Sequence, residues 1–202
     1  MDSVEVVSSD FSALPRHLIY RSQQPVSGLP EEFDWREAFA RMKLVPEIHD
    51  SAASYYLSHL ADGPFVGVSV RANKFAHQKT LEASPVEWYI ARMRELVAIN
   101  PDLSFFLSCD DPSAQKYISD SVPRVFSLEK TGRYNSVEGV KEAVIDLYIL
   151  SLASHILGPH WSSFVELSLA CASSRTTFET SQQPPESVTL YPLPNKPLWW
   201  RG

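Results

Sequence analysis

Two adjacent hydroxyl side chains, Ser162 and Ser163, stand at the expected start of a helix that directly follows an apolar run at residues 155–158. A strand that leads into a helix start forms an anion-binding site, because the first N–H groups of the helix are free and the positive end of its dipole faces outward. A serine pair at this place is most often only an N-cap. The surrounding residues therefore decide between the two interpretations.

A single carboxylate, Asp146, lies within an almost continuous apolar stretch at residues 143–153. An ionised group in such a setting is costly unless another group pairs with it or hydrogen-bonds to it. The alternative is that Asp146 faces solvent. The helix expected around it follows from apolar residues near the 3.6-residue period, namely Val137, Val140, Val144, Leu147 and Leu150.

Further polar side chains fall at the ends of the expected strands. They are Arg71, Asn73 and Lys74 after the first strand, Asp110 and Asp111 after the second, Arg133 before the helix of Asp146, and His160, Ser162 and Ser163 after the last strand. Ligands of parallel sheets bind beyond the carboxyl ends of the strands. This convergence is the strongest indication of a binding site.

The elements that must position these residues alternate along the chain. Apolar and β-branched runs predict strands at residues 65–71, 103–108, 124–127 and 155–158. Between them, helices are expected at residues 84–100, 112–122 and 136–150, with a polar loop at residues 72–83 and a further helix after Ser162. Alternation with short connections predicts an α/β fold, a Rossmann-like parallel sheet with helices on both faces.

Helix starts are marked by proline and by acidic residues. Residues 84–87, Ser-Pro-Val-Glu, form a capping sequence with an acid three residues after the serine, and packing helices are expected from Pro30 and Pro46. We expect residues 1–60 to be a helical and irregular segment on the core, and residues 61–180 to form the Rossmann-like domain. Residues 181–202 are rich in proline and are expected to lie extended, with Trp199 and Trp200 as an anchor for a partner chain or a second copy.

Composition limits the classes of partner. The chain has 202 residues, 44% hydrophobic and 21% charged, and a net charge of -6, which argues against a nucleic-acid or anionic membrane surface but permits a small anionic ligand. No apolar run reaches the length of a membrane span and no signal pattern is present at the N-terminus, so a cytoplasmic location is expected. Cys109 and Cys171 lack metal-ligand spacing and are expected to be reduced packing thiols, with no metal and no cofactor.

Three segments together resemble a known family. VGVSVRANK, FFLSCDDPSAQKY and residues 132–170 are similar to the donor-binding half of the fucosyltransferases of nodulation and N-glycan core type, which are related to the protein O-fucosyltransferases. The family pattern is a strand followed by H-x-R-R-x-D, a strand followed by T-D-D/S, an R-Y/N-S segment, a helix with a buried Asp, a strand and a serine pair. The match covers about residues 40–174 in the same order.

The resemblance implies a GT-B fold whose Rossmann-like domain binds GDP-fucose without a metal and transfers the sugar with inversion. It implies that Arg71 grips the diphosphate, that Asp110 and Asp111 line the nucleotide pocket, and that Asp146 accepts from the guanine edge. Ser162 and Ser163 would hold phosphate oxygens, and Asn73, Arg133 and His160 belong to the same expected site.

Three departures from the pattern concern the transfer step, and a fourth concerns the acceptor domain. Ser69 stands where the family has His, Ala72 where it has the second Arg, and Asn73 at the place of the Asp, so that leaving-group stabilisation is reduced unless Lys74 supplies a charge. Only about 60 residues precede the first strand, so the acceptor domain is missing, reduced or supplied by another chain.

The leading hypothesis is a glycosyltransferase that transfers a sugar from GDP-fucose or a similar nucleotide sugar to a glycan or other hydroxyl acceptor. Arg71 and Lys74 would receive the departing diphosphate, and Glu82 or His77 would deprotonate the acceptor. The alternative is a catalytically degenerate nucleotide- or glycan-binding protein or partner subunit. A Rossmann-like oxidoreductase is disfavoured, because no G-x-G-x-x-G follows the first strand.

Overall fold

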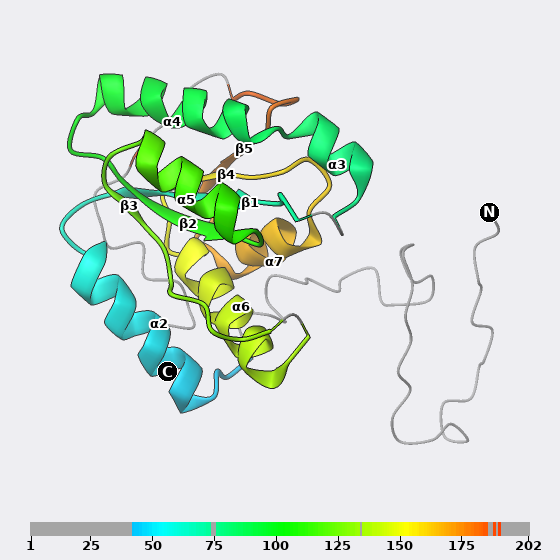
Figure 1. Ribbon diagram of the computed structural model, residues 1–202. Helices are drawn as coiled ribbons and strands as arrows, with labels where there is room; N and C mark the ends of the chain where they lie inside the picture. Colours follow the sequence, from blue (N-terminus) through cyan, green and yellow to red (C-terminus); the bar gives the residue numbers. More distant parts are fainter. Residues whose placement is uncertain (1–41, 74–75, 134, 186–187, 189, 191–202) are drawn as a thin grey trace, which may run out of the picture. The chain divides into compact units, whose positions relative to one another are not determined.

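The computed structural model describes residues 42–73, 76–133, 135–185, 188 and 190, all within one unit of the chain, Arg36–Gly202. The helix expected from Pro30, the side chain of Lys74 and the Trp199-Trp200 pair lie outside the described residues. In chain order the elements are α2 (Pro46–His59), β1 (Phe65–Val70), α3 (Gln78–Ala83), α4 (Val86–Ile99), β2 (Ser104–Cys109), α5 (Pro112–Ser121), β3 (Val125–Phe126), α6 (Val137–Leu150), β4 (His155–Leu157), α7 (Ser163–Cys171) and β5 (Thr177–Glu179) (Figure 1).

The described strands form a single parallel sheet in the order β3-β2-β1-β4-β5. The four strands predicted from the sequence therefore lie side by side in parallel, which confirms the α/β, Rossmann-like fold. The fifth strand, β5, was not predicted, because Thr177, Phe178 and Glu179 form too short a run to stand out as a strand. It pairs with β4 and extends the sheet on that side.

Helices cover both faces of the sheet (Figure 1). The first hydrophobic cluster lies under α2, α6 and α7, and includes Phe65 of β1 and Phe106 of β2. The second lies under α4 and α5, and includes Val66, Val68 and Val70 of β1. Successive residues of β1 thus enter opposite clusters, and because both faces are covered the whole strand is buried and reads as one apolar run.

Gly67 in β1 allows α6 to approach the sheet closely. A Cβ at this position would lie 2.8 Å from Leu150 Cδ2 and 3.2 Å from Ala153 Cβ. The absence of a side chain therefore sets the distance between β1 and the C-terminal end of α6. Asp146 lies one helical turn before Leu150 on α6.

The structure corrects two expectations about the segment after β1. Residues 72–83 were predicted as a loop, but residues 78–83 form α3, whose first turn is capped by His77 Nδ1 accepting from Lys79 N at 3.3 Å. Ser84 was predicted to cap α4, but that helix begins without a side-chain cap. The Ser84 hydroxyl instead accepts from the backbone N–H of His160 at 2.9 Å, which joins the end of α3 to the loop before α7.

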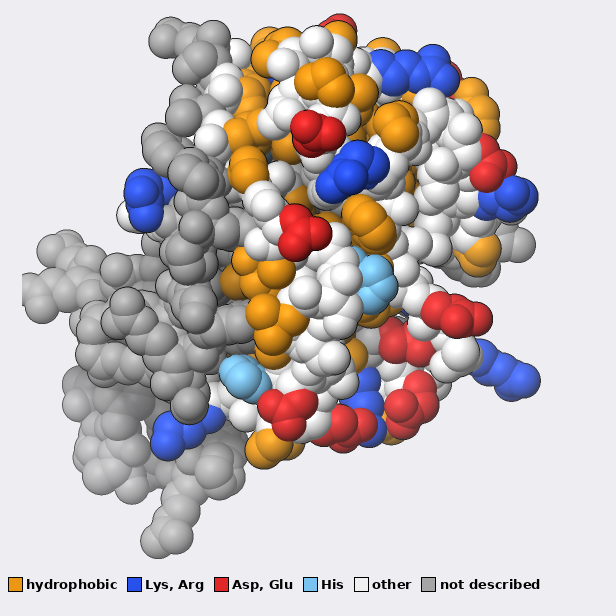
Figure 2. Space-filling view, turned by 90° about the vertical axis from the view of Figure 1, so that its left-hand side faces the viewer, with side chains coloured by type: hydrophobic (Ala, Val, Ile, Leu, Met, Phe, Trp, Pro, Cys, Tyr) orange, Lys and Arg blue, Asp and Glu red, His pale blue; other side chains and the backbone are white. Residues whose placement is uncertain are grey.

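The face shown in Figure 2 has a mixed surface. Lys and Arg side chains are scattered singly among acidic and apolar ones there. No helix among the described residues combines the length and apolar character needed to cross a membrane. Both cysteines, Cys109 and Cys171, are free and buried, and burial raises the pKa of each thiol to about 11.

Candidate functional site

The sheet order places a topological switch point between β1 and β4. The chain proceeds from β1 to β2 and β3 on one side, and then returns to add β4 and β5 on the other. The loops that leave the carboxyl ends of β1 and β4 therefore run in opposite directions. This switch of direction is where open parallel sheets bind ligands. The loop after β1 begins with Arg71, and the loop after β4 ends at Ser162.

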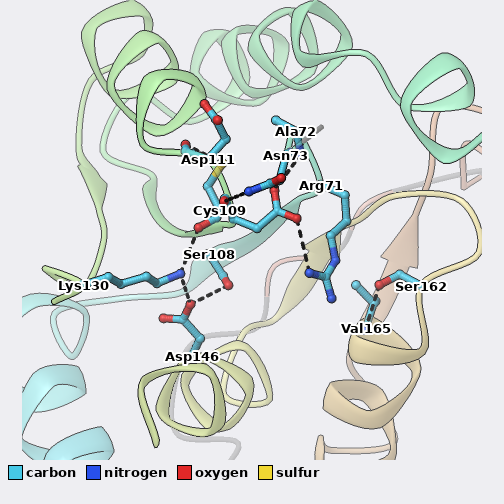
Figure 3. Close-up of polar contacts among 11 residues, drawn as sticks. Arg71, Ala72, Asn73, Ser108, Cys109, Asp111, Lys130, Asp146, Ser162 and Val165 are labelled. Carbon is cyan, nitrogen blue, oxygen red and sulfur yellow. Dashed lines mark hydrogen bonds and ion pairs between the residues drawn. The ribbon is translucent and has the colours of Figure 1, made fainter. Parts of the chain in front are cut away.

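The Arg71 side chain extends from the end of β1 toward the start of α7, where Ser162 and Val165 lie (Figure 3). Its Nη1 lies 3.3 Å from Asp110 Oδ2, and its guanidinium carbon lies 5.6 Å from the ring centre of Phe164 in the first turn of α7. The side chain is 39% exposed. The guanidinium is held on two sides and still offers N–H donors to an anion, which suits bidentate binding of phosphate oxygens.

Asp110 positions the loop that carries Arg71. Its Oδ1 accepts from the backbone N–H groups of Ala72 at 2.7 Å and Asn73 at 3.0 Å, and its own carbonyl oxygen accepts from Asn73 Nδ2 at 3.3 Å. The carboxylate predicted to line a nucleotide pocket is thus directed at the loop and at Arg71. The neighbouring carboxylate, Asp111, caps α5 by accepting from Ala114 N at 2.9 Å.

The serine pair combines a cap with a free helix start. Ser162 is buried and its Oγ accepts from Val165 N at 3.4 Å, so that its O–H proton remains available for donation. Ser163 is exposed and is the first residue of α7. The N-cap interpretation and the anion-site interpretation are therefore compatible at this position.

Asp146 is 1% exposed and is paired through one of its two oxygens. Its Oδ2 accepts from Ser108 Oγ at 2.6 Å and lies 2.6 Å from Lys130 Nζ, which also donates to the carbonyl oxygen of Cys109 at 2.9 Å (Figure 3). Burial raises the pKa of Asp146, and the ion pair with Lys130 and the bond from Ser108 offset only part of this effect. The prediction of a buried carboxylate is confirmed.

The second oxygen of Asp146, Oδ1, is buried and has no hydrogen-bond partner among the described residues. A buried acceptor without a partner costs about 1–3 kcal/mol. Such atoms are rare in folded proteins and call for an explanation. A ligand N–H group that reaches Oδ1 would remove this cost.

Lys130 was not identified from the sequence as a site residue. A buried carboxylate requires a cation, and Lys130 lies in the loop directly before the helix of Asp146, so the signal was present. The loop is held by Glu142, whose Oε1 accepts from the backbone N–H groups of Thr131 at 2.9 Å and Gly132 at 3.0 Å. Burial would raise the pKa of Glu142, but these bonds outweigh it and hold the pKa below its ordinary value.

The remaining predicted residues divide between this site and other places. Ser69 lies beside Ser108 in the sheet register, on the face that carries Asp146. Arg133 lies before the N-cap of α6, Ser136. Ser136 is about 15 Å from Asp146 along the helix axis. Glu82 and His160 line an open depression next to α3. Among the described residues no three His, Cys, Asp or Glu side chains are close enough to hold a metal ion.

The α/β fold with its parallel sheet and switch point is similar to that of solved fucosyltransferases. The structure of NodZ alpha-1,6-fucosyltransferase co-crystallized with GDP matches 66% of this chain and 44% of that chain at 25% identity, with a TM-score of 0.55. The selenomethionine form of fucosyltransferase NodZ from Bradyrhizobium matches 79% of this chain and 52% of that chain at 23% identity, with a TM-score of 0.57. The structure of POFUT1 in complex with GDP matches 71% of this chain and 49% of that chain at 16% identity, with a TM-score of 0.51.

The resemblance predicted from the sequence is thus confirmed at the level of the fold. This chain spans about half the length of the structures it matches. No protein-family model and no curated protein matches the sequence.

Proposed function

We propose that this chain binds a nucleotide sugar, GDP-fucose or a similar GDP-linked donor, as the donor-binding half of a GT-B glycosyltransferase, and transfers the sugar to a glycan or another hydroxyl acceptor. One observation carries the proposal. The buried Asp146, with a free acceptor at Oδ1, lies at the same edge of the sheet as Arg71 and the start of α7. These groups match the two ends of a nucleoside diphosphate.

The carboxylate favours guanine over other bases. Guanine presents two adjacent donors, N1–H and the N2 amino group, on its Watson–Crick edge, and Oδ1 of Asp146 is an acceptor without a partner among the described residues. Adenine presents an acceptor at N1, which a carboxylate repels. Lys130 uses two of its three donors, on Asp146 and on the carbonyl of Cys109, and its third is left for guanine O6.

The diphosphate would lie at the switch point between β1 and β4. Arg71 supplies a guanidinium, Ser162 an O–H proton, and Ser163 the free N–H at the start of α7. Asp110 and Asn73 hold the Arg71 loop, and Ser69 forms the adjoining wall. In this proposal Arg71, aided by Lys74, has the charge-neutralising role that a metal ion has in other transferases.

Transfer also requires a group that takes the proton of the acceptor hydroxyl. Glu82 is the better placed of the two candidates, because it lines an open depression and its hydrogen-bond partner among the described residues is Gln78 Nε2 at 2.8 Å. His77 uses Nδ1 to cap α3, which restricts its ring. Glu82 is therefore the proposed base. Arg133 and His160 are retained as outer members of the site.

A degenerate binding protein or partner subunit is the second candidate. It is favoured by Ser69 and Ala72 at the positions of a His and an Arg in the family pattern. A nucleotide-binding form of the second candidate would also bind GDP, a glycan-binding form or a partner subunit need not, and only the first candidate transfers sugar.

The decisive experiment is calorimetry with GDP on the wild-type protein, Arg71→Ala and Arg94→Ala. Arg94 is the matched control, because it is an exposed arginine that, among the described residues, bonds to the carbonyl oxygen of Ser121 on α5. Arg71→Ala should lose about 2–5 kcal/mol of GDP binding, and Arg94→Ala should bind as the wild type does. Equal affinity in all three proteins, or no binding at millimolar GDP, would contradict the proposal. Release of GDP from GDP-fucose, measured with and without glycan acceptors, separates the two candidates.

A further inference from the structure

An open depression of about 360 Å³ lies beside the switch point and shares Glu82 and His160 with the proposed site. It is lined by Lys79, Glu82, Ala83, His160, Trp161 and Gln182. These residues come from α3, from the loop before α7, and from the segment after β5, which run close together in Figure 1. The depression therefore adjoins the proposed phosphate site at Ser162 without being part of it.

The floor of the depression is built by hydrogen bonds between these segments. The backbone N–H of His160 donates to Ser84 Oγ at 2.9 Å, and Ser181 Oγ donates to the carbonyl oxygen of Ala83. Gln182 is held in a turn by its backbone N–H, which donates to Thr180 Oγ1 at 3.2 Å. Three segments that are distant in sequence are thus fixed to one another around the hollow.

Trp161 forms an aromatic wall of this depression. It is 66% exposed although it is the largest apolar side chain type, and its ring contacts that of His160 at a centroid distance of 4.0 Å. Its backbone has φ of 59°, a left-handed conformation that is unusual for a bulky residue and costs about 1–3 kcal/mol. A conformation that is unfavourable and also presents an indole to solvent indicates a role for the exposed ring.

The polar side chains around Trp161 complement a sugar ring. The C–H groups on one face of a pyranose carry partial positive charge and are attracted to the electron-rich face of an indole. Its hydroxyl groups both donate and accept, and the hollow offers an ammonium group on Lys79, a carboxylate on Glu82 and an amide on Gln182. A flat aromatic wall with a few polar groups at its edge is also the general form of a small-molecule site.

We propose that this depression binds a pyranose ring of the acceptor, stacked on Trp161 with its hydroxyl groups directed at Glu82 and Lys79. This inference rests on the proposed function, because it takes the donor to lie at the adjoining switch point. It assigns Trp161 as a residue that determines acceptor binding. It also explains why Glu82, the proposed base, lies beside an exposed indole.

The test is fluorine NMR of the full chain labelled with fluorotryptophan and titrated with methyl pyranosides of several configurations. The chain has five tryptophans, and the resonance of Trp161 is identified by its loss in Trp161→Phe, and that of Trp88 by its loss in Trp88→Phe. At least one pyranoside should shift the Trp161 resonance saturably and leave the Trp88 resonance unchanged. Trp161→Ala should weaken binding about tenfold in saturation-transfer measurements, while Tyr117→Ala, an exposed aromatic on α5, should not change it.

Two further measurements separate an acceptor site at this depression from a site for the sugar of the donor and from no sugar site at all. The pyranoside should still bind in the presence of saturating GDP-fucose, and competition between them would overturn the assignment to an acceptor, because the hollow would then hold the sugar of the donor. No saturable shift of Trp161 with any pyranoside would overturn the inference. Its failure is distinguishable from that of the donor site, since GDP binding and its loss in Arg71→Ala are measured without any pyranoside.

Discussion

Lys130 Nζ lies 2.6 Å from Oδ2 of Asp146, and the same ammonium group donates to the carbonyl oxygen at the end of β2. The pair joins the loop after β3 to α6 and to the sheet at the point where a base would bind. It satisfies one oxygen of the carboxylate and leaves the other buried without a partner among the described residues. The free protein therefore carries an electrostatic cost that a ligand can relieve.

Replacement of Asp146 by Asn should separate stability from binding. Because burial raises the pKa of Asp146, the folded state disfavours its ionised form, and this cost grows as the pH rises above the ordinary value of 3.8. A neutral amide of the same shape can still accept from Ser108. Asp146→Asn should therefore unfold in urea at an equal or higher concentration near neutral pH, while its affinity for GDP falls about tenfold or more. A less stable variant with unchanged GDP affinity would contradict this expectation.

Two substitutions of Asp110 distinguish positioning of the loop from contact with the ligand. Asp110→Asn keeps an oxygen for the N–H groups of Ala72 and Asn73 but removes the charge that faces Arg71, whereas Asp110→Ala leaves both N–H groups unbound. Asp110→Ala should lose about 1–3 kcal/mol of stability relative to Asp110→Asn. Asp110→Asn should retain GDP affinity, because the guanidinium no longer shares its charge with a carboxylate. Equal losses of affinity in the two variants would mean that Asp110 contacts the nucleotide itself.

Gly67→Ala should destabilise the chain and weaken GDP binding together. The added Cβ would lie 2.8 Å from Leu150 Cδ2 and 3.2 Å from Ala153 Cβ, so the Leu150 side chain, one helical turn after Asp146, must shift in a packed core. We expect a loss of about 1–3 kcal/mol in the free energy of unfolding, measured by urea denaturation. Gly63→Ala is the control, since nothing lies within 4 Å of a Cβ there. Equal stability of the two variants would show that α6 is not held by this contact.

The buried Glu179 should make the chain sensitive to acid. Its side chain is 2% exposed, with Oε1 at 2.7 Å from Arg92 Nε and Oε2 at 3.2 Å from His155 Nε2. Burial alone would raise the pKa of Glu179, but these partners outweigh it and lower the pKa from 4.5. A lowered carboxyl pKa contributes stability above pH 4.5, and this contribution is lost as the pH falls through the folded-state pKa.

Glu179→Gln is the variant that checks this. It should lose about 1–3 kcal/mol of stability near neutral pH, and the difference from the wild type should shrink below pH 4.5 in urea titrations across this range. Glu95→Gln is the exposed control, because Glu95 pairs with the same Arg92 from outside the core. If the free energies of unfolding of Glu179→Gln and the wild type differed by the same amount at every pH, ionisation of the Glu179 carboxylate would not be the cause of the difference.

The sheet could be predicted from the sequence because it is encoded locally. Each inner strand is buried on both faces, so Phe65 and its neighbours form an unbroken apolar run, and the helices between the strands begin at recognisable caps such as Ser136. The edge strand β5 escaped prediction because Thr177 and Glu179 are polar, and their partner His155 lies more than twenty residues earlier in the chain.

The site could be predicted only as far as residue type and strand ends allow. The burial of Asp146 followed from its apolar neighbours, but the identity of its cation did not, because Lys130 reaches it through a loop conformation that depends on Glu142. Asp110 was found at a strand end, but its bonds to Ala72 and Asn73 depend on how two loops meet. The role of Ser84 was hidden for the same reason, since His160 is its partner across the fold.

The switch point has a consequence for local opening of the chain. β1 pairs with β2 along its whole length but with β4 only over Val66–Val68. The β1–β4 pairing at the switch point is therefore shorter than the β1–β2 pairing. Backbone amides of β4 and β5 should therefore exchange with deuterium faster than those of β2 in the free protein. A nucleotide that bridges Arg71 and α7 would stabilise the β1–β4 pairing and slow hydrogen exchange of the β4 and β5 amides. The bound ligand would then hold strands β4 and β5 to strands β1, β2 and β3.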